Sequence, residues 1–110
     1  RVRDVDDPTT GSNAKFWIDA LRTEFVEQRG YVEVARGTVP DAVGVEGEWI
    51  EFTTNVRGER VDYLAAVWAR QGGLFGLGGP YLQVVEFAAR SGAYASRIEG
   101  VKAALRTVRE

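Results

Sequence analysis

Acidic side chains in the predicted strands are the residues of this chain best suited to acid–base chemistry. Glu51 and Asp62 fall on the same face of two adjoining strands, two residues out of register, and Glu86 interrupts an apolar strand. Paired carboxylates can cleave glycosidic bonds when a cleft holds them a defined distance apart. Carboxylates on an outward strand face are more often solvated, and Glu86 can pair across strands with Arg70 or Arg36. We therefore predict that none of these carboxylates is catalytic.

Histidine and cysteine are both absent from the 110 residues of the sequence. Their absence excludes zinc fingers, thiol redox chemistry, disulfide scaffolds and every catalytic triad that needs an imidazole. The acidic cluster Asp4, Asp6 and Asp7 is similar to the start of a calcium loop, but it lacks the glycine at the sixth position and the glutamate at the twelfth. No serine lies in a nucleophile elbow. We predict no metal, no cofactor and no enzymatic activity.

The segment QGGLFGLGGP, residues 71–80, is the most unusual stretch of the chain, because five of its ten residues are glycine. A phosphate-binding loop would precede a helix and usually carries a lysine, whereas this segment has no lysine and leads into a strand. Its apolar residues Leu74, Phe75 and Leu77 could fold back on the core of the domain. They could also form a mobile apolar tip that enters a partner groove or touches a membrane surface. We favour burial by a protein partner, either another protein or a second copy, over a membrane.

Trp49 and Trp68 share the second, mixed face of the predicted central hairpin. Large aromatic side chains usually pack beneath another element, so a helix could cover this face. If both helices packed on the opposite face, the two tryptophans would form an exposed binding surface, because tryptophan is a favoured interface anchor. Both arrangements are compatible with the sequence, and we include Trp49 and Trp68 among the candidate partner-binding residues.

A non-catalytic protein-binding domain is the function that these features favour. The alternative is a small carrier that holds an apolar ligand between sheet and helix, in a cavity that small core residues would permit. The net charge of −2, the pI near 5.2 and the scattered arginines argue against nucleic-acid binding. No apolar run approaches the ~20 residues of a membrane-spanning helix. The alanines that would permit a cavity are Ala65, Ala66, Ala69, Ala88 and Ala89.

Two amphipathic helices are predicted, one near each end of the chain. The first, of about 15 residues by its apolar spacing, begins after Ser12 or Asn13 and ends at Gly30. The second is predicted to begin near Arg97, because Ser96 and Glu99 have the spacing of a capping box. The apolar stripe of the second helix consists of Ile98, Val101, Leu105 and Val108.

Strands are predicted over residues 31–36, 48–56, 60–70 and 81–89, where β-forming residues alternate or run continuously. Val2 and Val5 could belong to a further short strand. Residues 37–47 are predicted to be mostly loop, since they contain Pro40 and several glycines. Parity across the central hairpin predicts one main core, formed by Ile50, Phe52, Tyr63, Val67, Ile98, Val101 and Leu105.

These elements predict an α+β domain, with an antiparallel sheet of about four strands flanked by an N-terminal and a C-terminal helix. The length fits a single domain over residues 1–110, with residues 1–12 as a loop-like lead-in. The chain begins at Arg1 rather than methionine, so we expect a fragment of a longer or processed protein.

The second half of the chain resembles the PsbP-like and Mog-type group of α/β/α sandwich proteins. The resemblance covers about residues 48–109 and is carried by the hairpin EWIEFTTNVRGERVDYLAAVWAR, the strand YLQVVEFAA and the helix SRIEGVKAALRTVR. It implies helices on both sides of a sheet and a partner-binding protein, commonly extracytoplasmic or membrane-tethered in bacteria. The group shares no catalytic residues that could be carried over to this sequence.

Overall fold

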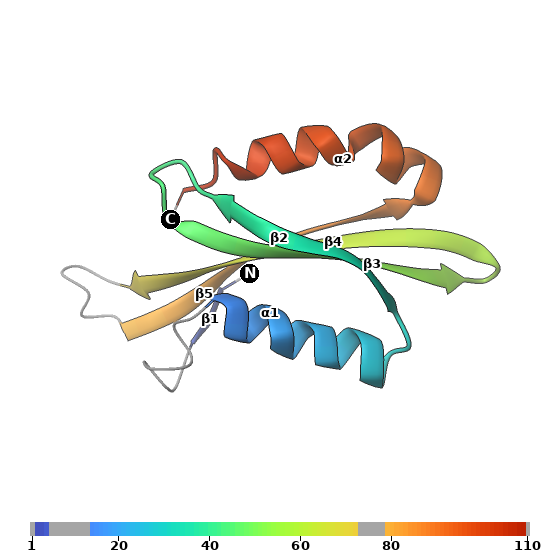
Figure 1. Ribbon diagram of the computed structural model, residues 1–110, viewed down its shortest axis with the longest axis horizontal. Helices are drawn as coiled ribbons and strands as arrows, with labels where there is room; N and C mark the ends of the chain where they lie inside the picture. The colour runs from blue at the N-terminus through green and yellow to red at the C-terminus, as the bar shows by residue number, and fades with distance from the viewer. Residues whose placement is uncertain (1, 5–13, 73–78, 110) are drawn as a thin grey trace.

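Five antiparallel strands form a single twisted sheet with helices on both faces (Figure 1). The computed structural model describes residues 2–4, 14–72 and 79–109. Strand order across the sheet is β1-β5-β4-β3-β2, so every chain-adjacent pair from β2 to β5 is also paired in space. The elements along the chain are β1 (Val2–Asp4), α1 (Ala14–Arg22), the π-helical turn η1 (Thr23–Gln28), β2 (Val32–Pro40), β3 (Glu46–Val56), β4 (Glu59–Gly72), β5 (Gly79–Arg90) and α2 (Ser91–Leu105).

The predicted α+β class and the flanking of the sheet by two helices are confirmed. The continuous helical segment of α1 and η1 lies on one face of the sheet, and α2 lies on the other. The first helix ends as predicted, because Gly30 takes the left-handed backbone conformation with φ of 75°. None of the helices in the described ranges is long and apolar enough to span a membrane.

The predicted loop over residues 37–47 is too long: only residues 41–45 form a turn, because β2 continues to Pro40 and β3 starts at Glu46. Gly37 and Gly47 are strand residues whose missing side chains make room for indole rings. A Cβ on Gly37 would lie 2.7 Å from the Trp49 ring, and one on Gly47 would lie 2.6 Å from the Trp68 ring. These glycines therefore serve close packing rather than a turn.

The glycine-rich connection is shorter than predicted, since β4 and β5 remain paired out to Gly72 and Gly79. Residues 73–78, which include the candidate residues Leu74, Phe75 and Leu77, lie outside the described part of the chain. One edge of the sheet is formed by β1, a short fifth strand that pairs with β5.

The second helix begins at Ser91, six residues before the predicted start, so the capping-box prediction is wrong. Ser96 lies inside the helix, where its hydroxyl donates a hydrogen bond to the carbonyl of Ala93. The chain turns directly from β5 into α2, and Tyr94 in the first turns stacks on Phe87 with ring centroids 5.5 Å apart. Packing on the strand that precedes it, rather than a side-chain cap, sets the start of α2.

The single core that was predicted is divided in two by the sheet. Ile50, Phe52, Tyr63 and Val67 pack beneath α1 and η1, as the hairpin parity requires. The intervening residues face α2, where Leu64, Ala66 and Trp68 pack with the apolar stripe of that helix. The prediction that Ile98, Val101 and Leu105 join the first group is therefore wrong. Because each face carries a helix, both faces of β4 are apolar.

Candidate functional site

Helix α2 leaves part of its own face of the sheet uncovered. It packs mainly on β4 and β5, while the α2-facing side of β2 and β3 extends beyond it. We call this area, formed by Val32, Ala35, Gly37 and Trp49, the open half of the α2 face; the register of β2 with β3 places these residues on one side, and Glu51, which is bonded to α2, borders it. Val32 at its margin is 60% exposed.

A groove of about 520 Å³ runs between α2 and the open half of the α2 face. A smaller hollow of about 220 Å³ lies beside the N-terminal part of α2 and reaches Val34, which is 55% exposed. Lys102 lines the groove, Glu51 lines the hollow, and the two side chains form an ion pair of 2.8 Å. The residues that line the groove are Thr38, Val39, Trp49, Glu99, Lys102, Ala103, Leu105 and Arg106.

Trp49 forms the floor of this groove and is held on two sides. Its ring lies over the backbone of Gly37, and the Lys102 ammonium is 4.2 Å from the ring centroid on the α2 side. Such a cation–π contact orients the ring as well as stabilising it. Trp49 is only partly buried, so part of the ring held between Gly37 and Lys102 remains accessible in the groove.

Glu51 is the acceptor of a polar cluster that fastens α2 to β3. The Tyr94 hydroxyl donates to its carboxylate at 2.6 Å, and Lys102 donates to the other oxygen at 2.8 Å. Burial, the hydrogen bond to Glu51 and the charge of that carboxylate together raise the pKa of Tyr94 far above its ordinary value. The phenol is thus a fixed donor rather than a base, and the cluster ties two elements together.

Asp62 and Glu86 are the other carboxylates that were considered for catalysis, and neither is bonded to the Glu51 cluster in the described part of the chain. Asp62 borders the same small hollow as Glu51, but its bonds go to Arg60 and to hydroxyl groups of neighbouring residues. Glu86 is exposed on β5, opposite Ala65. Arg36 binds Asp19 and Glu33, and Arg70 binds Asp41, so the pairing of Glu86 with either arginine stays a prediction.

A buried ion pair fixes the turn next to the groove. Arg70 and Asp41 are almost fully buried and are joined by a hydrogen bond of 2.5 Å. The second Asp41 oxygen accepts the backbone N–H groups of Val43 and Val45, whose exposed side chains form the tip of the turn. Burial alone would raise the pKa of Asp41, but the bonds from Arg70 and the two backbone N–H groups hold it below its ordinary value.

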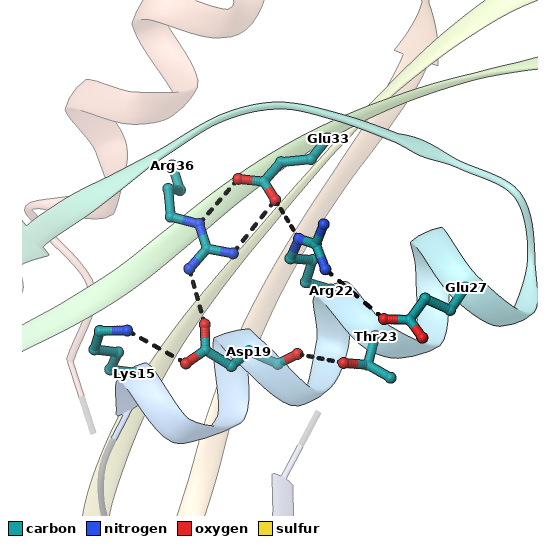
Figure 2. A network of polar contacts seen from close by, with 7 residues as sticks. All are labelled: Lys15, Asp19, Arg22, Thr23, Glu27, Glu33 and Arg36. Carbon is teal, nitrogen blue, oxygen red and sulfur yellow. Dashed lines mark hydrogen bonds and ion pairs between the residues drawn. The ribbon is translucent and has the colours of Figure 1, made fainter.

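The largest charged cluster lies on the opposite face and joins α1 to β2 (Figure 2). Arg36 binds Asp19 at 2.8 Å and Glu33 at 3.0 Å, while Arg22 binds Glu33 at 2.7 Å. Lys15 adds a further pair to Asp19. Asp19 and Glu33 each bridge two cations, so the cluster links the edge strand β2 to the helix.

The two predicted tryptophans have different environments. Trp68 has none of its surface exposed, because α2 crosses β4 above it. The condition for an open tryptophan face, both helices on the other side, is not met, and only Trp49 is accessible. Sequence reasoning missed Glu99, Lys102 and Arg106. Their spacing of three and four residues beside the apolar stripe of the last helix was the available signal.

Comparison with protein-family models, curated proteins and solved structures finds no match for this chain. The PsbP-like resemblance therefore stays a prediction. Within the described ranges, no group of three or more acidic side chains could hold a metal ion.

Proposed function

We propose that this protein is a non-catalytic binding domain that holds part of a partner protein on the open half of the α2 face. The observation that carries the proposal is the groove of about 520 Å³ with Trp49 as its floor. Tryptophan contributes strongly at protein interfaces when its pocket is already formed and water is excluded on binding. Gly37 and Lys102 hold the Trp49 ring in place, so little ordering is needed when a partner binds.

The surroundings of the groove favour a protein over a small apolar ligand. Thr38, Glu99 and Arg106 are exposed at its rim, and charged side chains alternate there with small ones. A carrier for an apolar ligand would instead need an enclosed apolar cavity. Val43 and Val45 are exposed in the turn that joins β2 to β3 and offer a further apolar surface that a partner could cover. Leu74, Phe75 and Leu77 remain a second predicted contact.

A photo-crosslinking amino acid at Ala103, an exposed α2 residue that lines the groove, would identify partners, and each captured protein would then be purified and titrated against the domain. We expect Trp49→Ala to weaken this binding by at least about tenfold, as for an interface hot spot. The titration is run at a domain concentration where the domain is monomeric, so that self-association does not contribute.

Phe16→Ala is the matched control, because Phe16 is a partly exposed aromatic residue of α1 on the opposite face. It should leave the affinity unchanged. Equal binding by wild type and Trp49→Ala, with both proteins folded, would contradict the proposed site. An equal loss in Phe16→Ala would show that the effect is not specific to the groove.

A further inference from the structure

We propose that the part of the partner held on the open half of the α2 face is an extended segment of a different protein, which pairs with the free edge of β2 as a sixth strand. The inference rests on the proposed function and names the form that the partner takes at that site. In such pairing, main-chain hydrogen bonds provide affinity and alternate side chains provide specificity.

Strand β2 forms one edge of the sheet, and no strand in the described ranges pairs with its outer side. The Asp41 N–H donates to the Val45 carbonyl at 2.9 Å, which fixes the alternation of hydrogen bonds between β2 and β3. The odd-numbered residues within 35–39 therefore direct their backbone groups to β3. Arg36 and Thr38 occupy the alternate positions, so their N–H and C=O groups point away from β3 at the free edge.

Pro40 supports this assignment of the free backbone groups. Proline has no N–H to donate, and Pro40 falls at a position where that group would face outward. The features that usually block a free edge lie at the two ends of the strand. Pro40 is at one end, and a shift of register between Glu33 and Ala35 is at the other. Residues 35–39 between them pair regularly with β3, so their outer side can accept a short strand.

Arg36 is the one charged residue within this stretch, and its side chain is held on the α1 face. Its guanidinium binds Asp19 of α1 at 2.8 Å and Glu33 at 3.0 Å (Figure 2). A charged side chain that was free at the edge would discourage a further strand, whereas this one is retained by two carboxylates. On the α1 face the added strand would lie beside a charged network, which favours polar side chains there.

On the α2 face, the Trp49 ring reaches across Gly37 toward the free edge. A Cβ on Gly37 would lie 2.7 Å from Cζ2 and 2.9 Å from Nε1 of Trp49, so the ring occupies the space above the edge strand. Residues directly opposite one another on adjoining strands are about 4.5–5.5 Å apart. A side chain opposite Gly37 on the added strand would therefore contact the accessible end of the ring, which favours an apolar residue at that position.

The free backbone groups distinguish an extended segment from a helix in the same place. A helix bonds its own backbone groups internally, so it would cover Trp49 and leave Arg36 and Thr38 unpaired. A second copy of β2 is a poor source of the segment. Within residues 35–39 its α2 face offers alanine, glycine and Val39, and Val39 is already buried in its own core. A second copy would thus bring no large apolar side chain to the Trp49 ring.

The test uses peptides of about seven residues, a typical strand length, selected against the whole chain from a random display library and synthesised with blocked ends. We expect the peptides to bind and to slow amide hydrogen exchange at Arg36 and Thr38 by at least about tenfold. Thr38→Pro removes an outward N–H but no bond to β3, so it should weaken binding by at least about tenfold. Thr38→Val keeps that N–H and is the matched control, which should bind as the wild type does.

Methylation of alternate peptide nitrogens provides a test that leaves the protein unaltered, should Thr38→Pro fail to fold. Methylating the amides that face β2 should abolish binding, and methylating the intervening amides should preserve it, because only one set is bonded to the sheet. Equal effects of the two sets would overturn the inference. Unchanged exchange at Arg36 and Thr38, full binding by folded Thr38→Pro, or a library that yields no binding peptide would overturn it as well.

Two further outcomes separate this inference from the proposed function. Protection of the Arg36 and Thr38 amides that rises with the concentration of the free chain would assign the edge to a second copy and overturn the inference. If the partner captured at Ala103 needs Trp49 but binds Thr38→Pro normally, the extended form is wrong and the binding site stands. If Trp49→Ala affects neither the peptides nor that partner, the site itself is wrong.

Discussion

Glycines 37 and 47 set how closely two indole rings approach the backbone of the sheet. At Gly37 the atoms that a Cβ would meet all belong to the Trp49 side chain. At Gly47 they include the backbone carbonyl of Val67 as well as the Trp68 ring. A side chain can turn aside, whereas a paired strand cannot, so the two positions differ in tolerance.

We predict that Gly47→Ala destabilises the domain by about 1–3 kcal/mol, as overpacking does, and by more than Gly37→Ala. Gly37→Ala should instead move the Trp49 ring and change its fluorescence. Gly100→Ala, where a Cβ has open space, is the control and should raise monomer stability by about 0.5–1 kcal/mol. Urea titrations of the three variants measure these effects, and equal losses at positions 37 and 47 would contradict the ranking.

Tyr94 provides a second test at the scale of single residues. Because the pKa of its phenol is raised in the folded state, the folded protein keeps a proton that the unfolded chain releases above about pH 10. The stabilisation from this group is therefore complete below about pH 10 and is lost as the pH rises further. We predict that the stability of Tyr94→Phe falls less steeply in alkali, as measured by urea titrations at increasing pH. An unchanged slope would show that the phenol is not coupled to folding.

At the scale of elements, the turn over residues 41–45 depends on one buried ion pair. Arg70 reaches from β4 to Asp41, and Gln83 on β5 accepts a further hydrogen bond from the same guanidinium. Removing the cation leaves a carboxylate that is buried without its partner, which is more harmful than losing an exposed pair.

We predict that Arg70→Met destabilises the domain by about 3–5 kcal/mol, the usual cost of breaking a buried pair. Arg90→Met removes an exposed pair with Glu59 and should change stability by no more than about 0.5 kcal/mol. Guanidinium unfolding of both variants gives the comparison. Similar losses would mean that the burial of Arg70 does not distinguish it from a surface arginine.

Sequence reasoning predicted the elements better than their ends. Alternation placed Trp49 and Trp68 correctly on one face of the hairpin, because parity depends only on strand geometry and turn length. Alternation could not predict which strands α2 would cover. The position of α2 over β4 determines that Trp68 is buried and that Trp49 stays partly accessible. Gly37 and Gly47 were assigned to a loop because glycine usually marks a turn. Their packing against Trp49 and Trp68 cannot be read from the local sequence, since these partners are distant along the chain. Ser96 and Glu99 have the spacing of a helix start but occur within the helix.

At the scale of the whole molecule, several carboxyl groups release their protons more readily in the folded state. A hydrogen bond from Arg36 is the main cause of the lowered pKa of Asp19 and of Glu33. Burial would raise the pKa of Asp41 and Asp62, but the hydrogen bonds that they accept outweigh it, and both stay below their ordinary values. These groups belong to three separate clusters across the sheet, so we expect their contributions to the free energy of unfolding to add independently.

We predict a stability that is nearly constant between about pH 6 and 8 and falls as the pH drops below about 4. The flat region follows from the absence of histidine, whose side chain would titrate there. A lowered carboxyl pKa stabilises the fold above the unfolded value, about 4, and this contribution disappears as the pH falls through the folded value. Glu48, whose pKa is raised mainly by burial, opposes this trend.

Thermal unfolding measured as a function of pH tests this profile. In Arg36→Met the stability should decline less steeply in acid, because Asp19 and Glu33 lose their shared cation. A steep change between pH 6 and 8 would instead point to a strongly shifted carboxyl group.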